Sequence, residues 1–268
     1  MTVSAAHPGS RAFFSAHPVF RREEYARALG RAANDRTLSA LLTKHLKAGN
    51  IRRVARGVFA SVPPHMEAAD WVVDRYLAAS RLKPDAILAY HSALELHGAA
   101  YTDAPDVQAL TAGEPTLFET PDFTCRFLKR PEGFAPTRDT TTVDRAGLLV
   151  PVTTLERTTA DIFDRPDLAG DAEELWNSLA LVERLKTNDL IRQASGLNNA
   201  AAAGALGWWL ERNQRRLGVP EKALAALQSM KPKHPQYVLG AKKGDARSVA
   251  AWNILVPRAL TLDSFEGA

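Results

Sequence analysis

The 268-residue sequence predicts an α+β fold, in which a small basic module at the amino terminus precedes a larger domain of mixed α/β character. Three observations support this prediction. The stretch from Asp35 to Val62 has the pattern of one amphipathic helix followed by a short hairpin. Pro63-Pro64 directly follows the hairpin and cannot continue a strand ladder. The net charge changes sign across these prolines, so we expect one domain over residues 1–64 and a second over residues 65–268.

A helix is expected over residues 36–48. Its apolar residues recur at helical spacing and gather on one face: Leu38, Leu41, Leu42 and Leu46. The opposite face carries Arg36, Ala40, Thr43, Lys44 and Lys47. Asn34 or Asp35 can cap the start of this helix, and Gly49 can end it in a left-handed turn. The helix therefore has one apolar and one basic face.

Two β-branched runs follow the helix, at residues 51–54 and 58–62, with Gly57 in the short connection between them. This spacing is typical of a tight hairpin that needs a positive φ at the glycine. Upstream, residues 11–16 and 21–29 are expected to form two short helices that bury aromatic side chains. The order of three helices and a hairpin predicts a winged helix-turn-helix module, in which the third helix reads duplex DNA and the hairpin is the wing.

The distribution of charge favours DNA as the partner of this module. Residues 1–62 contain 11 Lys and Arg against three acidic residues, a net charge of +8, whereas residues 63–268 contain 23 against 27, a net charge of −4. A lysine-rich helix face alone is also common on a merely solvated helix, but the hairpin and the segregated charge together favour phosphate binding. The predicted DNA-binding residues are Arg36, Thr37, Thr43, Lys44, Lys47, Arg52, Arg53 and Arg56.

The second domain is expected to begin with a helix over residues 66–82. Short strand-like segments separated by Gly or Pro predict a small mixed sheet over about residues 85–152. Capped amphipathic segments then predict a helical part over about residues 153–230, and two closing strands are expected within about residues 237–257.

The composition is that of an ordinary globular protein, with 46% hydrophobic and 24% charged residues. No apolar run reaches the roughly 18 residues that a membrane span needs, and the first residues lack the pattern of a signal peptide. We therefore expect a cytoplasmic protein without a membrane partner. Cys125 is the single cysteine, which excludes an internal disulfide and a thiolate metal cluster, and it is expected to be a small residue in a strand.

Several stretches in a fixed order resemble the AbiEi antitoxins, the transcriptional-regulator half of the bacterial abortive-infection AbiE toxin-antitoxin systems. The stretches are HPVF at 17–20, RRVARGVFASVP at 52–63, YHSALELHG at 90–98, VTTLERTTADIFDRPDLAGDAEELWNSL at 152–179 and WNILVP at 252–257. The resemblance extends from about Phe13 to Pro257. It implies a winged module that represses the promoter of its own operon, and a body that counteracts a cognate nucleotidyltransferase toxin in phage defence. In such type IV systems the two proteins act on a common process rather than forming a tight complex.

The chain itself is expected not to be an enzyme and to need no cofactor or metal. The glycine-rich stretch at residues 240–244 lacks the Lys-Ser/Thr of a phosphate-binding loop. Two alternatives stay open. One is a nuclease-like C-terminal domain, although the strand-like segments lack the carboxylate and lysine pattern that holds a divalent metal. The other is a one-component transcriptional regulator whose body binds a small ligand.

Two pairs of polar residues in the second domain are expected to be structural. His91 and His97 are six residues apart, a spacing that does not bring both rings to one face of a helix, so capping and core packing are favoured over metal binding. Arg157 and Asp161 are four residues apart and are expected to pair along the surface of a helix.

Overall fold

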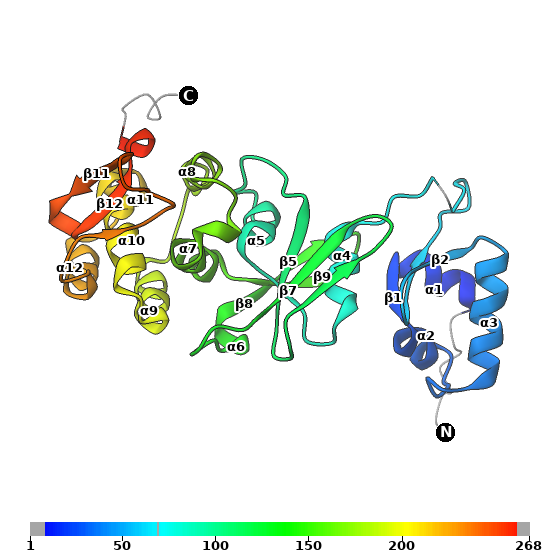
Figure 1. The fold of residues 1–268 in the computed structure, drawn as a ribbon. Helices are drawn as coiled ribbons and strands as arrows, with labels where there is room; N and C mark the ends of the chain where they lie inside the picture. The colour runs from blue at the N-terminus through cyan, green and yellow to red at the C-terminus, as the bar shows by residue number, and fades with distance from the viewer. Residues whose placement is uncertain (1–8, 69, 262–268) are drawn as a thin grey trace, which may run out of the picture.

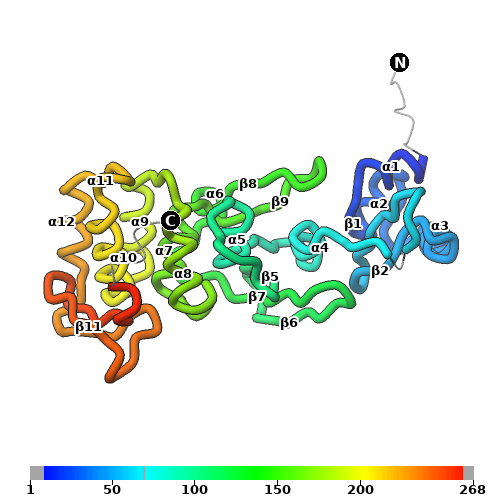
Figure 2. The backbone as a smooth tube through the Cα atoms, turned by 90° about the horizontal axis from the view of Figure 1, so that it is seen from above, coloured from blue at the N-terminus to red at the C-terminus, as the bar shows by residue number. Residues whose placement is uncertain are grey.

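The computed structural model describes residues 9–68 and 70–261. The fold is a mixture of α-helices and β-strands, as predicted. Figure 1 shows an elongated molecule of three parts in a row: an N-terminal module, a central sheet with its helices, and a C-terminal group of helices with a small sheet. The view from above in Figure 2 gives the same order.

Within residues 9–61, the N-terminal module has three helices and a three-stranded antiparallel sheet in the order β1–β3–β2. Its elements are α1 (Ser10–Ala16), β1 (Val19–Arg21), α2 (Arg22–Ala28), α3 (Arg36–Lys47), β2 (Ile51–Ala55) and β3 (Val58–Ser61). The predicted helices and hairpin are present, whereas β1 was missed because three residues are too few to show an alternating pattern. The Asp35 carboxylate accepts the N–H of Thr37 at the start of α3, and Gly57 has a φ of +77° in the hairpin turn.

The N-terminal sheet buries side chains on both of its faces. One face packs against α3 through Phe20, Leu38, Leu42, Ile51 and Phe59. The other face contributes Val19, Val54, Val58 and Ala60 to an apolar core that also contains Tyr76 and Leu77 of α4 (Arg75–Leu82). The N-terminal module therefore shares a core with the rest of the chain.

The predicted helix over residues 66–82 is wrong in its first half, because α4 begins only at Arg75. The described residues between 66 and 74 form turns or irregular structure, and Ala69 lies outside the described residues. The Asp74 carboxylate accepts the backbone N–H groups of Tyr76 and Leu77, which fixes the helix start at this point. Arg145 from a neighbouring hairpin donates two hydrogen bonds to the same carboxylate.

The central part is a mixed six-stranded sheet in the order β6–β7–β5–β4–β9–β8. Its strands are β4 (Ile87–Leu88), β5 (Asp106–Thr111), β6 (Thr116–Glu119), β7 (Thr124–Lys129), β8 (Thr140–Arg145) and β9 (Leu148–Thr153). The pairs β5–β7 and β4–β9 are parallel and the other three pairs are antiparallel. Two helices belong to this part, α5 (Tyr90–Leu96) and α6 (Pro136–Asp139). Cys125 is buried in β7, as expected.

The C-terminal part is mainly helical, as predicted, with a small three-stranded sheet at its end. Its helices are α7 (Leu155–Asp164), α8 (Ala172–Ala180), α9 (Thr187–Leu197), α10 (Ala200–Arg212), α11 (Gln214–Leu217) and α12 (Glu221–Met230), with short 3-10 turns at Pro166–Leu168, Ala250–Trp252 and Arg258–Thr261. Its strands are β10 (Gln236–Tyr237), β11 (Ala246–Val249) and β12 (Ile254–Pro257). Trp252 packs so closely on α10 that a Cβ at Gly207 would lie 2.1 Å from its ring, so a glycine is required there.

Candidate nucleic-acid interface and central pocket

The polar face of α3 is fully exposed at the end of the molecule farthest from the C-terminal part (Figure 1). Arg36, Thr37, Thr43, Lys44 and Lys47 are all exposed, while Leu38 and Leu42 on the opposite face are buried. The exposed polar face and the buried apolar face of α3 are therefore the ones that the sequence predicts. A shallow hollow between Thr43, Lys44 and Lys47 faces solvent.

Arg22 of α2 holds the start of α3 in place. The Arg22 guanidinium donates to the carbonyl of Ala33 and, at 2.7 Å, to Ser39 Oγ. A further ion pair of 2.9 Å joins Arg31 to Asp35. Two of the eleven N-terminal arginines and lysines therefore orient the helix instead of facing a partner.

The hairpin arginines do not share one role. Arg53 and Arg56 are exposed, and the Arg53 guanidinium lies 5.8 Å from the centre of the Phe59 ring. Arg52 points to the other side of the sheet and pairs with Asp122, in the turn between β6 and β7, at 2.6 Å. Successive strand residues point to opposite faces, so the prediction that Arg52 and Arg53 act together on DNA does not fit this geometry. Arg52 joins the hairpin to the central part.

Arg21 makes a second polar connection between the N-terminal module and the central part. Its guanidinium donates to the backbone carbonyls of Ser80, Arg81 and Lys83 at the end of α4, at 3.1, 2.8 and 2.6 Å. Glu24 lies beside it and pairs with Arg81. The cations left without an acidic partner, within the part of the chain that the structure describes, include Arg36, Lys44, Lys47 and Arg56.

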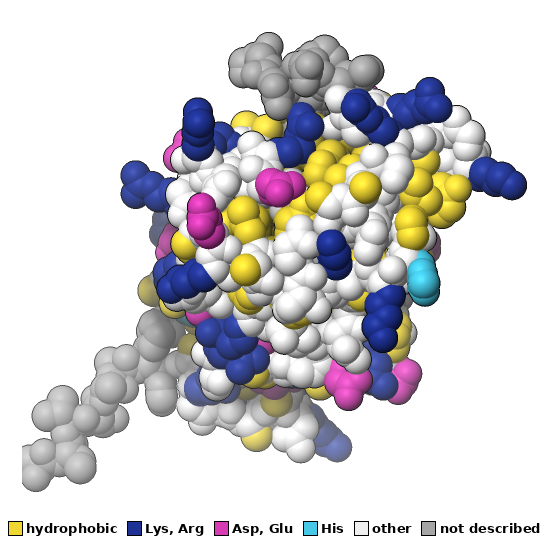
Figure 3. Space-filling model, turned by 90° about the vertical axis from the view of Figure 1, so that its left-hand side faces the viewer, with side chains coloured by type: hydrophobic (Ala, Val, Ile, Leu, Met, Phe, Trp, Pro, Cys, Tyr) yellow, Lys and Arg dark blue, Asp and Glu magenta, His cyan; other side chains and the backbone are white. Residues whose placement is uncertain are grey.

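The charge varies along the chain more sharply than the two predicted domains indicate. Residues 63–182, which comprise the central part together with α7 and α8, contain 10 Lys and Arg against 20 acidic residues, whereas residues 183–261, the rest of the C-terminal part, contain 13 against five. The net charge of −4 counted for residues 63–268 is therefore the sum of −10 over residues 63–182, +8 over residues 183–261 and −2 over residues 262–268. Figure 3 shows the C-terminal end of the molecule with Lys and Arg side chains spread around an apolar area.

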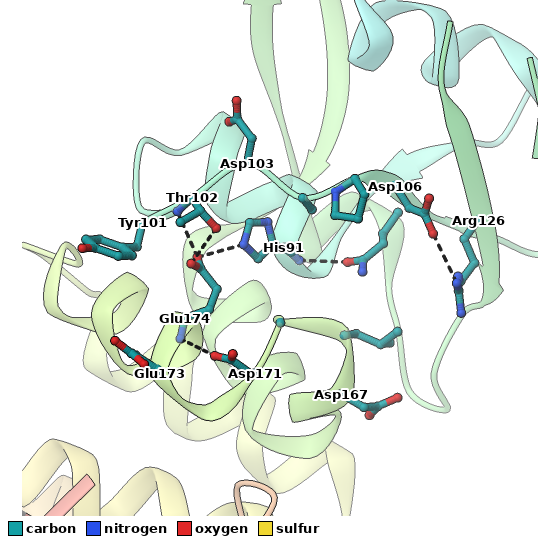
Figure 4. Close-up of a pocket in the computed structure, with 15 residues that line it drawn as sticks. His91, Tyr101, Thr102, Asp103, Asp106, Arg126, Asp167, Asp171, Glu173 and Glu174 are labelled. Carbon is teal, nitrogen blue, oxygen red and sulfur yellow. Dashed lines mark hydrogen bonds and ion pairs between the residues drawn. The ribbon is translucent and has the colours of Figure 1, made fainter. Parts of the chain in front are cut away.

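The central part contains a pocket of about 520 Å³ that the sequence did not indicate (Figure 4). His91 of α5, Thr102 and Glu174 of α8 converge at its wall. The Glu174 carboxylate accepts from His91 Nε2 at 3.0 Å, Thr102 Oγ1 at 2.7 Å and Ser178 Oγ at 2.8 Å. The other ring nitrogen, Nδ1, lies 3.3 Å from the carboxylate of Glu95.

Both ring nitrogens of His91 therefore face carboxylates. Burial by itself lowers the pKa of His91, but the hydrogen bonds and negative charges of Glu95 and Glu174 outweigh burial and raise the pKa above its ordinary value. The imidazolium form can donate to both carboxylates, which the neutral ring cannot. Both oxygens of the Glu174 carboxylate accept hydrogen bonds that hold α5, α8 and the Thr102 loop together. The arrangement of His91, Glu95 and Glu174, called the His91 clip below, is therefore structural.

The predicted roles of the other polar residues can now be assigned. His97 Nε2 lies 2.7 Å from the carbonyl of Thr153, which is a packing role as expected. Arg157 and Asp161 do pair, at 2.7 Å, but both are buried, so the expected surface pair is wrong. Asp139 and Gln193 complete this buried network. Arg157 was mistaken for a surface residue because the sequence does not show that α9 covers α7.

The sequence did not predict the contacts of Arg21, Glu95 and Glu174. His91 and Glu95 are four residues apart, a spacing that brings side chains together on a helix and could have indicated their contact. Glu174 lies 83 residues from His91, and no local pattern connects the two.

Among residues 9–68 and 70–261, no three or more His, Cys, Asp and Glu side chains are grouped so that they could hold a metal ion. None of their helices is both long and apolar enough to cross a membrane.

Comparison with known proteins gives information on the fold. No protein-family model and no curated protein matches the chain. Among solved structures, the chain is similar to the crystal structure of the RV2827C protein from Mycobacterium tuberculosis, with a TM-score of 0.65 and 17% sequence identity over 93% of this chain and 90% of that chain. At this level of identity the likeness shows that the two chains share a fold along nearly their whole length.

Proposed function

We propose that the N-terminal module is a winged helix-turn-helix that binds duplex DNA, with α3 in the major groove and the β2–β3 hairpin as the wing. The observation that carries this proposal is the exposed basic face of α3, whose Arg36, Lys44 and Lys47 make no ion pair within the described residues. Side chains at this face suit base edges and phosphates, and Arg56 at the hairpin tip suits a flanking phosphate. In Figure 2, α3 lies at the outer end of the module, on the side away from the central part.

We further propose that the protein is an antitoxin and transcriptional autorepressor that counteracts a cognate nucleotidyltransferase toxin. This proposal rests on the resemblance to the AbiEi antitoxins and on the separation of a basic DNA-binding end from an acidic centre. The chain is proposed to act as a binding protein without catalysis of its own.

The DNA-binding proposal is tested with the full chain and duplexes that cover the region upstream of its gene. Fluorescence anisotropy over a range of salt concentrations should give a slope of log K against log salt of about −4, because the four cations proposed to contact DNA, Arg36, Lys44, Lys47 and Arg56, displace about that many counterions. A flat salt dependence, or equal binding of the upstream duplex and of a scrambled duplex, would contradict the proposal.

The antitoxin proposal is tested by co-expression with a nucleotidyltransferase encoded next to this gene. The full chain should restore survival, and a variant with Lys44→Ala and Lys47→Ala should restore it as well if its promoter is replaced by one that the protein does not control. Loss of rescue by the double variant at equal protein level would mean that toxin control acts through DNA binding.

A further inference from the structure

A cavity of about 710 Å³ lies between the N-terminal module and the segment that connects it to the central part. Phe14 of α1 and His45 of α3 form one side. Pro63 and Trp71 of the connecting segment and Ala146, in the turn between β8 and β9, form the other. The volume is in the range that proteins use for small organic ligands.

The wall of this cavity has apolar surfaces and hydrogen-bond donors. Phe14 and His45 pack edge to face with their ring centres 4.8 Å apart. The indole N–H of Trp71 is buried and has no hydrogen-bond partner, which is costly for a polar group removed from water. Arg11 lies exposed at the rim, and none of the described lining residues is an Asp or Glu.

Asn50 Nδ2 lies 3.2 Å from His45 Nδ1. Since the amide donates in this pairing, the neutral His45 ring carries its proton on Nε2 and is also a donor. Burial, followed by the charge of Lys44, lowers the pKa of His45 and favours this neutral form. The wall therefore combines donors and a cation with aromatic surface.

We propose that this cavity binds a small apolar carboxylate, whose hydrocarbon body lies between Phe14, Pro63 and Trp71 and whose carboxylate accepts the Trp71 N–H and faces Arg11. A carboxylate satisfies the unpaired donor and complements the cation, whereas an apolar molecule without an acceptor leaves the indole N–H unpaired.

The position of the cavity connects this ligand to DNA binding. His45 belongs to the same helix as Lys44 and Lys47, while Trp71 and Ala146 belong to the connecting segment and the central sheet. A ligand that contacts both sides shifts the equilibrium between arrangements of α3 and the central part if it binds one arrangement more tightly than the other. The effect of the ligand on DNA binding rests on the proposed DNA-binding function, whereas ligand binding to the cavity does not.

Ligand binding is tested on the full chain without DNA, with 1-anilinonaphthalene-8-sulfonate as a fluorescent aromatic anion. Naphthalene-2-carboxylate should displace it at a concentration about tenfold lower than naphthalene-2-carboxamide, which has the same ring system without the charge. Trp71→Phe and Arg11→Gln should each weaken carboxylate binding about threefold to tenfold. The matched control Arg27→Gln removes an exposed cation that does not line the cavity and should leave binding unchanged.

Equal displacement by the carboxylate and the amide overturns the proposal, and this comparison needs no variant to fold. Equal effects of Arg11→Gln and Arg27→Gln overturn it as well. Coupling is then measured by repeating the anisotropy titration with saturating naphthalene-2-carboxylate, which should shift the apparent Kd for DNA at least about threefold. Ligand binding with an unchanged Kd overturns the coupling step, whereas failure of the protein to bind DNA at all overturns the proposed function and leaves the ligand site intact.

Discussion

At the scale of single residues, the N-terminal cations divide into those that hold the module and those that face solvent. Arg21, Arg22 and Arg52 are bound to backbone carbonyls or to acidic side chains, whereas Lys44 and Arg56 are exposed. The count of 11 bases therefore overstates the number available to DNA. Only the exposed group is expected to contribute to the salt dependence of the proposed DNA binding.

Alanine substitution of exposed cations should separate the binding face from the general charge of the module. Lys44→Ala, Lys47→Ala and Arg56→Ala should each weaken DNA binding by roughly 1 to 3 kcal/mol if the contact is to a base edge, and should reduce the salt slope by about 1. Arg27→Ala removes an equal charge from α2 and serves as the control. If all four variants lose the same affinity in anisotropy titrations, the face is misassigned.

Arg52 should behave differently from the other hairpin arginines. Arg52→Ala and Asp122→Ala each break the ion pair between the hairpin and the central part, so a double-mutant cycle should give a coupling of about 0.5 to 1 kcal/mol in the free energy of unfolding. Chemical denaturation of the two single variants and the double variant measures this coupling. Additive effects in the cycle, together with a loss of DNA affinity specific to Arg52→Ala, would return Arg52 to the DNA-binding residues.

At the scale of elements, buried polar networks fix how α5, α7, α8 and α9 are arranged. Tyr76 and Arg75 of α4 both bind Glu95, which in turn faces His91, so one network extends from α4 through α5 to α8. Such networks are strong when every member is satisfied and costly when one member is removed.

The His91 clip should make stability depend on pH in a defined direction. The raised pKa of His91 means that its contribution is fully present below the ordinary value of 6.5 and is lost as the pH rises through the folded-state pKa. Glu95 and Glu174, whose pKa values are lowered in spite of burial, lose their contribution only as the pH falls below about 4.5. The difference in unfolding free energy between wild type and His91→Gln should thus be greatest between these limits, at about 1 to 3 kcal/mol.

Urea denaturation of wild type and His91→Gln, from about pH 4.5 to well above pH 6.5, measures the difference in unfolding free energy between the two proteins. His97→Gln provides the control, because its ring contacts a backbone carbonyl and no carboxylate. A difference that grows above pH 6.5 would contradict the assignment of an imidazolium between Glu95 and Glu174.

The buried pair in α7 should be sensitive to the loss of one charge. Burial raises the pKa of Asp161 to about 6, although Arg157 opposes this shift, so the pair is more weakly ionised than a surface pair would be at mildly acidic pH. Asp161→Asn leaves the buried Arg157 guanidinium with only the more distant carboxylate of Asp139, at 3.8 Å, and should cost about 3 kcal/mol of unfolding free energy. The double variant Arg157→Met with Asp161→Leu should recover most of this loss, as measured by thermal unfolding. If the double variant and Asp161→Asn are equally unstable, packing and not charge sets the loss of stability.

At the scale of the whole molecule, the N-terminal module is joined to the centre by a shared apolar core, by Arg21 and by the Arg52–Asp122 pair. Pro63-Pro64 marks a change in charge along the chain, but the contacts across this point are extensive. Domains joined in this way are expected to stabilise one another.

A chain that begins at residue 65 should therefore be folded but less stable than the full chain. Losing the cover of Val19, Val58 and Ala60 exposes the α4 core and should cost about 3 kcal/mol, which lowers Tm by roughly 10 °C for a domain of this size. Differential scanning calorimetry of the fragment and the full chain measures the shift. Substituting Leu77→Ser should destabilise the full chain far more than the fragment, and identical Tm values for fragment and full chain would mean that the modules are independent.

The sequence by itself determined the local features of this protein: the amphipathic α3 with its Asp35 cap, the hairpin around Gly57, and the order of strands followed by capped helices. These features arise from spacing, capping and backbone preference within a few residues, which a sequence displays directly. Only the tertiary structure decided that Arg52 binds Asp122, 70 residues away, that Glu174 meets His91, and that α1, α3 and the connecting segment line a cavity with the unpaired Trp71 N–H. Such contacts join residues that are distant in the chain. Whether a charged side chain faces solvent, an ionic partner or the core depends on its burial, and no local sequence pattern shows burial.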